Sequence, residues 1–157
     1  MPMSEEELEF HKKEARHCFN HAWDYLDKGD RSPQDDVEML HLAHASRYHW
    51  GLVGGVREAA IGEWQISRIY AAIGQPSLSL RFAAQALGIC ELNDLTDLLH
   101  VAFEGMARAS IAMGDQETAR TFLLKARANL ETLHLDADDR KAYLQQIEDT
   151  EGLLRAK

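Results

Sequence analysis

The side chains of this sequence that could bind a metal are glutamates and histidines spaced three or four residues apart, as on one face of a helix. They form two sets with the pattern Glu-x-x-His, and the candidate metal ligands are Glu14, His17 and His21 in one set and Glu38, His41 and His44 in the other. Residues three or four apart lie on one helix face, and di-iron helical bundles use this spacing. A divalent metal between two helices, completed by Glu58 or Glu63, is therefore one hypothesis.

The same spacing recurs at Glu131 and His134, near an expected helix end. The pattern therefore arises readily in a chain rich in both residue types, and solvated pairs are its commoner meaning. The sequence predicts no bound cofactor, with the metal site as the alternative.

A second group of chemically capable side chains follows on the same stretch. His41, His44, Arg47 and Trp50 combine imidazole, guanidinium and indole groups within ten residues. Together with Glu63 they support an alternative function, a helical enzyme or sensor that binds a metal or small molecule. Motifs for established catalytic classes are missing, since the sequence has no G-x-S-x-G, H-E-x-x-H or Walker pattern. The sequence therefore predicts a protein that is not an enzyme.

The amino-acid composition limits the classes of partner that the chain is expected to bind. The net charge is −9, with 17 basic against 26 acidic residues and no basic cluster, which argues against nucleic acid. No apolar run reaches the ~18 residues of a membrane span, and the first residues are acidic where a signal peptide is basic. Cys18 and Cys90 lie far apart, as is typical of a reducing compartment. We expect a cytoplasmic protein that binds neither nucleic acid nor membrane.

The elements that must position these residues are helices, because apolar residues recur at three and four and no segment alternates with period two. Ser4 and Asp136 are expected to cap helix starts, and a turn at Ser32 and Pro33 to precede the second helix; Pro76 is expected to open the fourth. At 157 residues the chain is the size of one domain. We expect an all-α domain over 1–157, with helix pairs over 4–50, 56–91 and 95–133 and a capping helix over 137–155.

The glycines that close the first helix of each pair align. Gly29, Gly74 and Gly114 each follow a small residue by seven positions, and these small residues are Ala22, Ser67 and Ala107. Tyr25, Tyr70 and Ser110 stand four positions before the same glycines, and alanines such as Ala83, Ala86, Ala119 and Ala126 follow the second and third. Self-similarity of this kind is typical of repeat architectures.

These residues resemble the tetratricopeptide repeat (TPR), whose helix pairs carry a small residue and a tyrosine, a Gly-Asp turn and then spaced alanines. The likeness covers about 14–133 and is best at 96–131, but the glycine spacings of 45 and 40 residues exceed the family's ~34. The chain is also similar to small TPR-like proteins of bacteria. The resemblance implies a right-handed superhelix of three antiparallel helix pairs with a capping helix.

The family's groove positions fall, by this register, on Phe19, Trp23, Trp64, Arg68, Glu104 and Arg108. Aromatic and arginine side chains are common in binding surfaces. Trp23 and Trp64 could also be core residues, which is the commoner role of a single tryptophan. The family's clamp for chaperone tails is not reproduced, because Trp23 and Glu104 stand where that clamp has amide and basic groups. The sequence therefore predicts a non-catalytic adaptor that binds a protein or peptide partner in a concave groove, or a second copy of itself as a homodimer.

Overall fold

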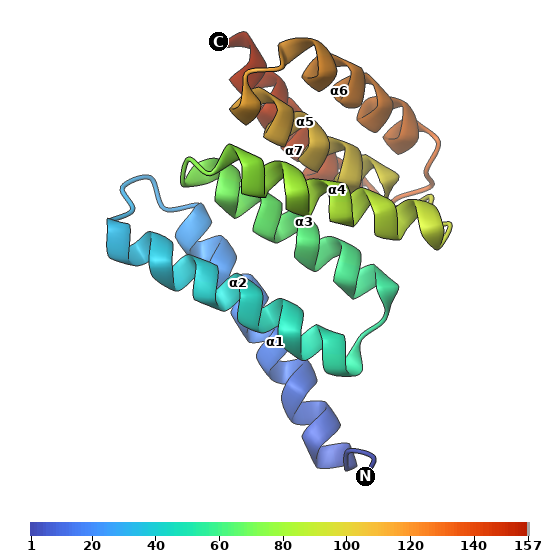
Figure 1. The fold of residues 1–157 in the computed structure, drawn as a ribbon. Coiled ribbons are helices and arrows are strands. Elements are labelled where there is room, and N and C mark those ends of the chain that lie inside the picture. Colours follow the sequence, from blue (N-terminus) through green and yellow to red (C-terminus); the bar gives the residue numbers. More distant parts are fainter. Residues whose placement is uncertain (157) are drawn as a thin grey trace.

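The structure, a computed structural model, describes residues 1–156, and this range is helical with no strand. Seven helices joined by short turns make up the fold (Figure 1), namely α1 (Glu5–Leu26), α2 (Pro33–Val53), α3 (Val56–Ala72), α4 (Pro76–Leu92), α5 (Leu99–Met113), α6 (Gln116–Glu131) and α7 (Ala137–Arg155). The prediction of an all-α chain is confirmed. None of the helices within 1–156 is both long enough and apolar enough to cross a membrane.

Local side-chain chemistry sets most helix starts. Ser4 accepts from the Glu7 backbone N–H while the Glu7 carboxylate accepts from the Ser4 N–H, and Ser32 and Asp35 form the same capping box before α2. Asp136 accepts from the Asp139 N–H at the start of α7. The expected caps at Ser4 and Asp136 are confirmed, and Ser32, expected in a turn, is a third cap.

Two helix boundaries differ from the sequence prediction. Helix α2 continues through Gly51 to Val53 and ends at Gly54. Helix α5 begins at Leu99, four residues later than its apolar pattern indicated. The intervening turn is held from α6, because the Asn129 side chain donates to the Thr96 carbonyl and accepts from the His100 N–H, each at 2.8 Å.

Consecutive helices pack as antiparallel pairs, α1 with α2, α3 with α4 and α5 with α6 (Figure 1). Small side chains let the pairs approach closely: Ala22 and Ala107 have no exposed surface and Ser67 is 1% exposed. The core consists of three buried clusters. Met39, Ile66 and Ile69 belong to one, Trp64 and Val101 to the second, and Leu123, Leu130 and Ile147 to the third.

Helix α7 has no partner helix of its own and packs on α5 and α6. Its apolar face consists of Tyr143, Leu144, Ile147 and Leu154, of which Ile147 is 1% exposed. Figure 1 shows α7 behind α5, on the side of the molecule where α3 also lies. This position brings α7 against the helices that carry the expected groove residues.

Candidate binding site

Glu104 of α5 is the centre of a buried polar network between three helices. Its carboxylate accepts hydrogen bonds from Trp64 Nε1 of α3 at 2.6 Å, from Thr150 Oγ1 of α7 at 2.6 Å and from Arg108 Nε at 3.0 Å. Arg68 Nη1 of α3 lies 3.4 Å from the same carboxylate. These five residues, with Gln146, are called the Glu104 cluster below.

The Glu104 cluster carries its charge inside the protein. The side chain of Glu104 is 2% exposed and those of Arg68 and Arg108 are 11% and 14% exposed. Burial alone raises the pKa of Glu104, but the guanidinium groups of Arg108 and Arg68 and the hydrogen bonds from Thr150 and Trp64 outweigh it and hold that pKa below its usual range. Glu104 is therefore ionised and fully paired, as a buried carboxylate must be.

Helix α7 covers the inner part of the surface that repeat register assigned to a groove. Thr150 bonds both Glu104 and Arg108, and Gln146 accepts from Arg68. The expectation that Glu104 lies on an open groove is wrong, because residues of the same chain occupy its carboxylate. The residues that the predicted register grouped do lie close together in the structure. The ring centroids of Trp23 and Trp64 are 5.5 Å apart, and the Arg68 guanidinium lies over both rings. Arg68 and Arg108 in turn contact Glu104.

Gly105 makes room for the Trp64 indole. A Cβ built on Gly105 would lie 3.0 Å from Trp64 Cδ1. We therefore expect Gly105→Ala to lower the free energy of unfolding by about 1–3 kcal/mol, as overpacking does. The matched control is Gly88→Ala in α4, where a Cβ has no neighbour within 4 Å. That variant should gain up to about 1 kcal/mol from helix propensity.

Urea unfolding of both glycine variants measures the contrast. A Gly105→Ala protein as stable as the Gly88→Ala protein would show that α3 and α5 are not in close contact at Trp64. Such a result would remove the packing reason given for the Trp64 position.

Beside the Glu104 cluster is an apolar cavity of about 350 Å³. Aromatic and aliphatic side chains from four helices line it, together with the Gln146 amide, and they are Phe19, Trp23, Ile61, Trp64, Leu98, Val101 and Tyr143. Most of these side chains are half-buried, so the cavity opens to solvent. Its size is at the lower end for small-molecule sites.

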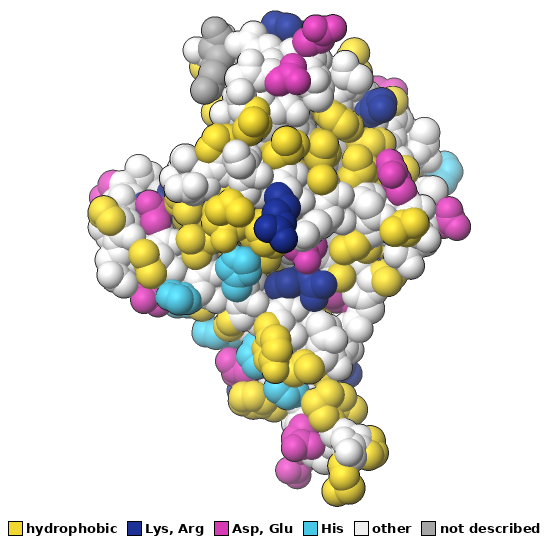
Figure 2. Space-filling view, viewed as in Figure 1, with side chains coloured by type: hydrophobic (Ala, Val, Ile, Leu, Met, Phe, Trp, Pro, Cys, Tyr) yellow, Lys and Arg dark blue, Asp and Glu magenta, His cyan; other side chains and the backbone are white. Residues whose placement is uncertain are grey.

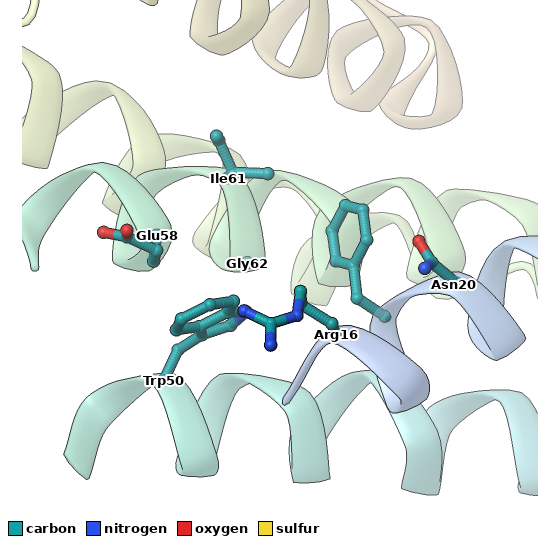
Figure 3. Close-up of a pocket in the computed structure, with 7 residues that line it drawn as sticks. Arg16, Asn20, Trp50, Glu58, Ile61 and Gly62 are labelled. Atoms are coloured by element: carbon teal, nitrogen blue, oxygen red, sulfur yellow. The ribbon is translucent and has the colours of Figure 1, made fainter. Parts of the chain in front are cut away.

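A second cavity of about 240 Å³ adjoins the first, and Phe19 and Ile61 line both. Its other lining residues are Arg16, Asn20, Trp50, Glu58 and Gly62. Figure 3 shows the Arg16 and Trp50 side chains reaching toward one another from α1 and α2, with Glu58, Ile61 and Gly62 across from them on α3. The two cavities together are called the aromatic trough, whose inner half touches the Glu104 cluster and whose outer half ends at Trp50.

The two glutamate and histidine sets are not brought together. On α1, His17 lies beside His21, which stacks on Tyr25. On α2, His44 Nε2 is 3.2 Å from the Tyr70 hydroxyl and its ring packs on Phe82, so it faces α3 and α4 rather than α1. Burial lowers the pKa of His44.

The remaining members of the two sets make no common site either. Glu38 accepts from Gln34, and Glu14 and His41 form no side-chain hydrogen bond within the described range. Residues 1–156 hold no group of three or more His, Cys, Asp or Glu side chains placed to bind a metal. Figure 2 shows histidine side chains (cyan) spread along the face that α2 presents in Figure 1.

The group His41, His44, Arg47 and Trp50 also separates. Arg47 Nε pairs with Glu63 Oε1 at 3.0 Å, and its aliphatic part packs where Gly62 has no Cβ. Trp50 alone lines the aromatic trough. The repeating turn of the helix points these side chains in different directions, so they do not form one site.

The predicted site did not include the α7 residues Tyr143, Gln146 and Thr150, which fall in the predicted capping helix. It did not include Arg16 in the middle of α1 either. The signal available was the spacing of Tyr143, Gln146 and Thr150, which puts the three on one helix face with Ile147. When a capping helix carries polar residues beside its apolar face, the helices that it packs on are expected to present polar groups there.

Another histidine contact also went unpredicted. His11 Nδ1 and His49 Nδ1 are 2.8 Å apart between α1 and α2, with Phe10 edge-on to both rings. Only one of the two facing nitrogens can carry the proton of this bond.

Comparisons of the chain with protein-family models, with curated proteins and with solved structures found no match.

Proposed function

We propose that the chain is a non-catalytic adaptor, built as a TPR-like array of three helix pairs capped by α7, which binds a segment of a partner protein in the aromatic trough. The observation that carries this proposal is the trough itself. It combines half-buried aromatic side chains such as Phe19, Trp23 and Trp50 with charged groups at its margin. Rigid aromatic surface beside arginine is the composition of binding hot spots.

Equivalent turns support the repeat interpretation. Gly74 and Gly114 have φ values of 78° and 83°, the left-handed region that glycine favours. The residue after each glycine donates to the carbonyl five positions earlier, Gln75 to Tyr70 at 2.8 Å and Asp115 to Ser110 at 2.9 Å. The second and third pairs therefore turn in the same way, as repeats do.

Charged side chains at the outer half of the trough favour directional polar contacts with a partner segment over purely apolar ones. Arg16 and Glu58 face the same cavity from α1 and α3 and can bond opposite groups of a partner. A partner segment with one apolar side chain for the Phe19 and Ile61 surface, flanked by charged residues, fits this arrangement.

The test is partner capture by a trough variant. Phe19→Asp combined with Ile61→Asp puts two charges in the wall that both cavities share, and we expect capture from the native cell extract to fall about tenfold or more. The matched control is Leu124→Asp on α6, whose side chain is 71% exposed and outside the trough. Equal capture by the folded trough variant and the control would contradict the proposal.

A photo-reactive residue placed at Phe19 gives a second readout that does not depend on the charged variant folding. Cross-links at Phe19 and none at Leu124 support partner binding in the trough. Cross-links between two copies of the chain would identify the homodimer as the partner. Cross-links at Leu124 alone would place the interface elsewhere and contradict the proposal.

A further inference from the structure

Arg68 is a buried guanidinium with unpaired donors. Its Nη1 donates to the Gln146 side-chain carbonyl and lies 3.4 Å from Glu104. Its Nε is buried and has no hydrogen-bond partner, and within residues 1–156 no hydrogen bond involves its Nη2. Nε and Nη2 share one edge of the guanidinium, so Arg68 makes fewer hydrogen bonds than its five donor hydrogens allow.

The charges around Arg68 do not balance at close range. Arg68 and Arg108 share the single carboxylate of Glu104. Burial, opposed by the attraction of Glu104, lowers the pKa of Arg68 to about 10, and Asp149 and Asp27 act only as weaker charges. One further negative group beside Arg68 would neutralise the Glu104 cluster.

The inner half of the trough reaches this arginine. Gln146 both lines the cavity and accepts from Arg68 Nη1, so a group that enters the cavity and displaces the Gln146 amide meets Nη1 of the guanidinium. The Arg68 guanidinium carbon lies 5.2 Å from the Trp23 ring and 6.0 Å from the Trp64 ring. The same two rings line the cavity, together with Tyr143. Flat apolar walls therefore adjoin a cation that is incompletely paired.

We propose that the inner half of the aromatic trough is a site for a small organic carboxylate with a flat apolar body, such as an aromatic acid. Its carboxylate takes the place of the Gln146 amide at Nη1 of Arg68, and its body lies between Trp23, Trp64 and Tyr143. The cavity of about 350 Å³ holds a body of two fused rings. This inference rests on the proposed binding role of the trough and names the chemistry of a ligand at its inner end.

Calorimetric titration with 2-naphthoate and with 2-naphthamide tests the role of the carboxylate. The two probes have the same rings and differ in charge. We expect saturable binding of the acid and about tenfold or more weaker binding of the amide, because a hydrogen bond to a charged group contributes more than one to a neutral group. Equal binding of the two probes, or no binding of the acid up to its solubility limit, would overturn the proposal.

Gln146→Glu supplies a carboxylate from within the chain. Its side chain starts from the position that already reaches Arg68, so we expect a folded protein with a higher Tm that binds 2-naphthoate about tenfold or more weakly. The matched control is Gln145→Glu, which makes the same charge change one residue away, where the side chain bonds Asp149 on the exposed face. If both variants bind 2-naphthoate like the unchanged protein, the carboxylate site is wrong.

The two proposals fail separately. Absence of 2-naphthoate binding together with lost capture by the Phe19 and Ile61 variant overturns the carboxylate site and leaves the adaptor function standing. Binding of 2-naphthoate that Gln146→Glu abolishes, with unchanged partner capture, supports the carboxylate site and overturns the adaptor function.

Discussion

Glu104→Ala is expected to lower the free energy of unfolding by about 3–5 kcal/mol, the usual effect of removing one partner from a buried ion pair. The side chain is 2% exposed and its loss leaves Arg68 and Arg108 without their shared carboxylate. Trp64 Nε1 loses its acceptor as well, and Thr150 Oγ1 keeps only the Gln146 backbone carbonyl at 3.2 Å. Urea unfolding followed by circular dichroism measures the change.

Two further variants separate charge from shape. Glu104→Gln keeps the volume and removes the charge, so it should lose most of the same stability. Glu91→Ala, on the exposed end of α4, should change stability by no more than about 0.5 kcal/mol. A loss below about 1 kcal/mol for Glu104→Ala would mean that the Glu104 cluster behaves as an exposed ion pair.

Acidification from pH 7 to pH 5 is expected to cost about 2 kcal/mol of stability through His100 alone. Burial, opposed by the nearby Asp97 carboxylate, lowers the pKa of His100 from 6.5 to about 4, and the side chain lies against Tyr143 with ring centroids 4.6 Å apart. Between these two values the unfolded chain binds a proton that the folded chain does not. Stability is therefore complete above pH 6.5 and falls as the pH falls toward 4, by about 3 kcal/mol in total.

His100→Phe keeps an aromatic ring against Tyr143 and removes the titration. Its stability should change far less between pH 7 and pH 5 than that of the unchanged protein. Exposed His134 is the matched control, since His134→Phe should leave the pH dependence as it was. Identical pH dependence for the unchanged protein and His100→Phe would contradict the assignment to His100.

Helix content and most helix starts could be predicted from the sequence because their causes are local. Ser4 and Glu7 or Ser32 and Asp35 lie within one turn of each other, and their capping needs no other part of the chain. The start of α5 could not be predicted, because Asn129 fixes it from 29 residues away. A non-local bond decides that boundary.

The candidate site could be predicted only in part, again because some of its contacts come from distant parts of the chain. Repeat register located Trp64, Arg68 and Glu104 near one another, since register relates equivalent positions. It carried no information about α7, whose Thr150 and Gln146 reach across from outside the three helix pairs. The two glutamate and histidine sets do not meet in the structure. Their spacing determines which helix face they share, but it does not determine which neighbouring helix that face packs against.

The Glu104 cluster also bears on how the chain folds during synthesis. Arg68, Glu104 and Arg108 leave the ribosome before Thr150 and Gln146 do, because synthesis runs from the N-terminus. Until α7 docks, the Glu104 carboxylate lacks one donor and the cavity lacks its Tyr143 wall. The buried ion pairs of the Glu104 cluster are therefore complete only after the last helix has been made.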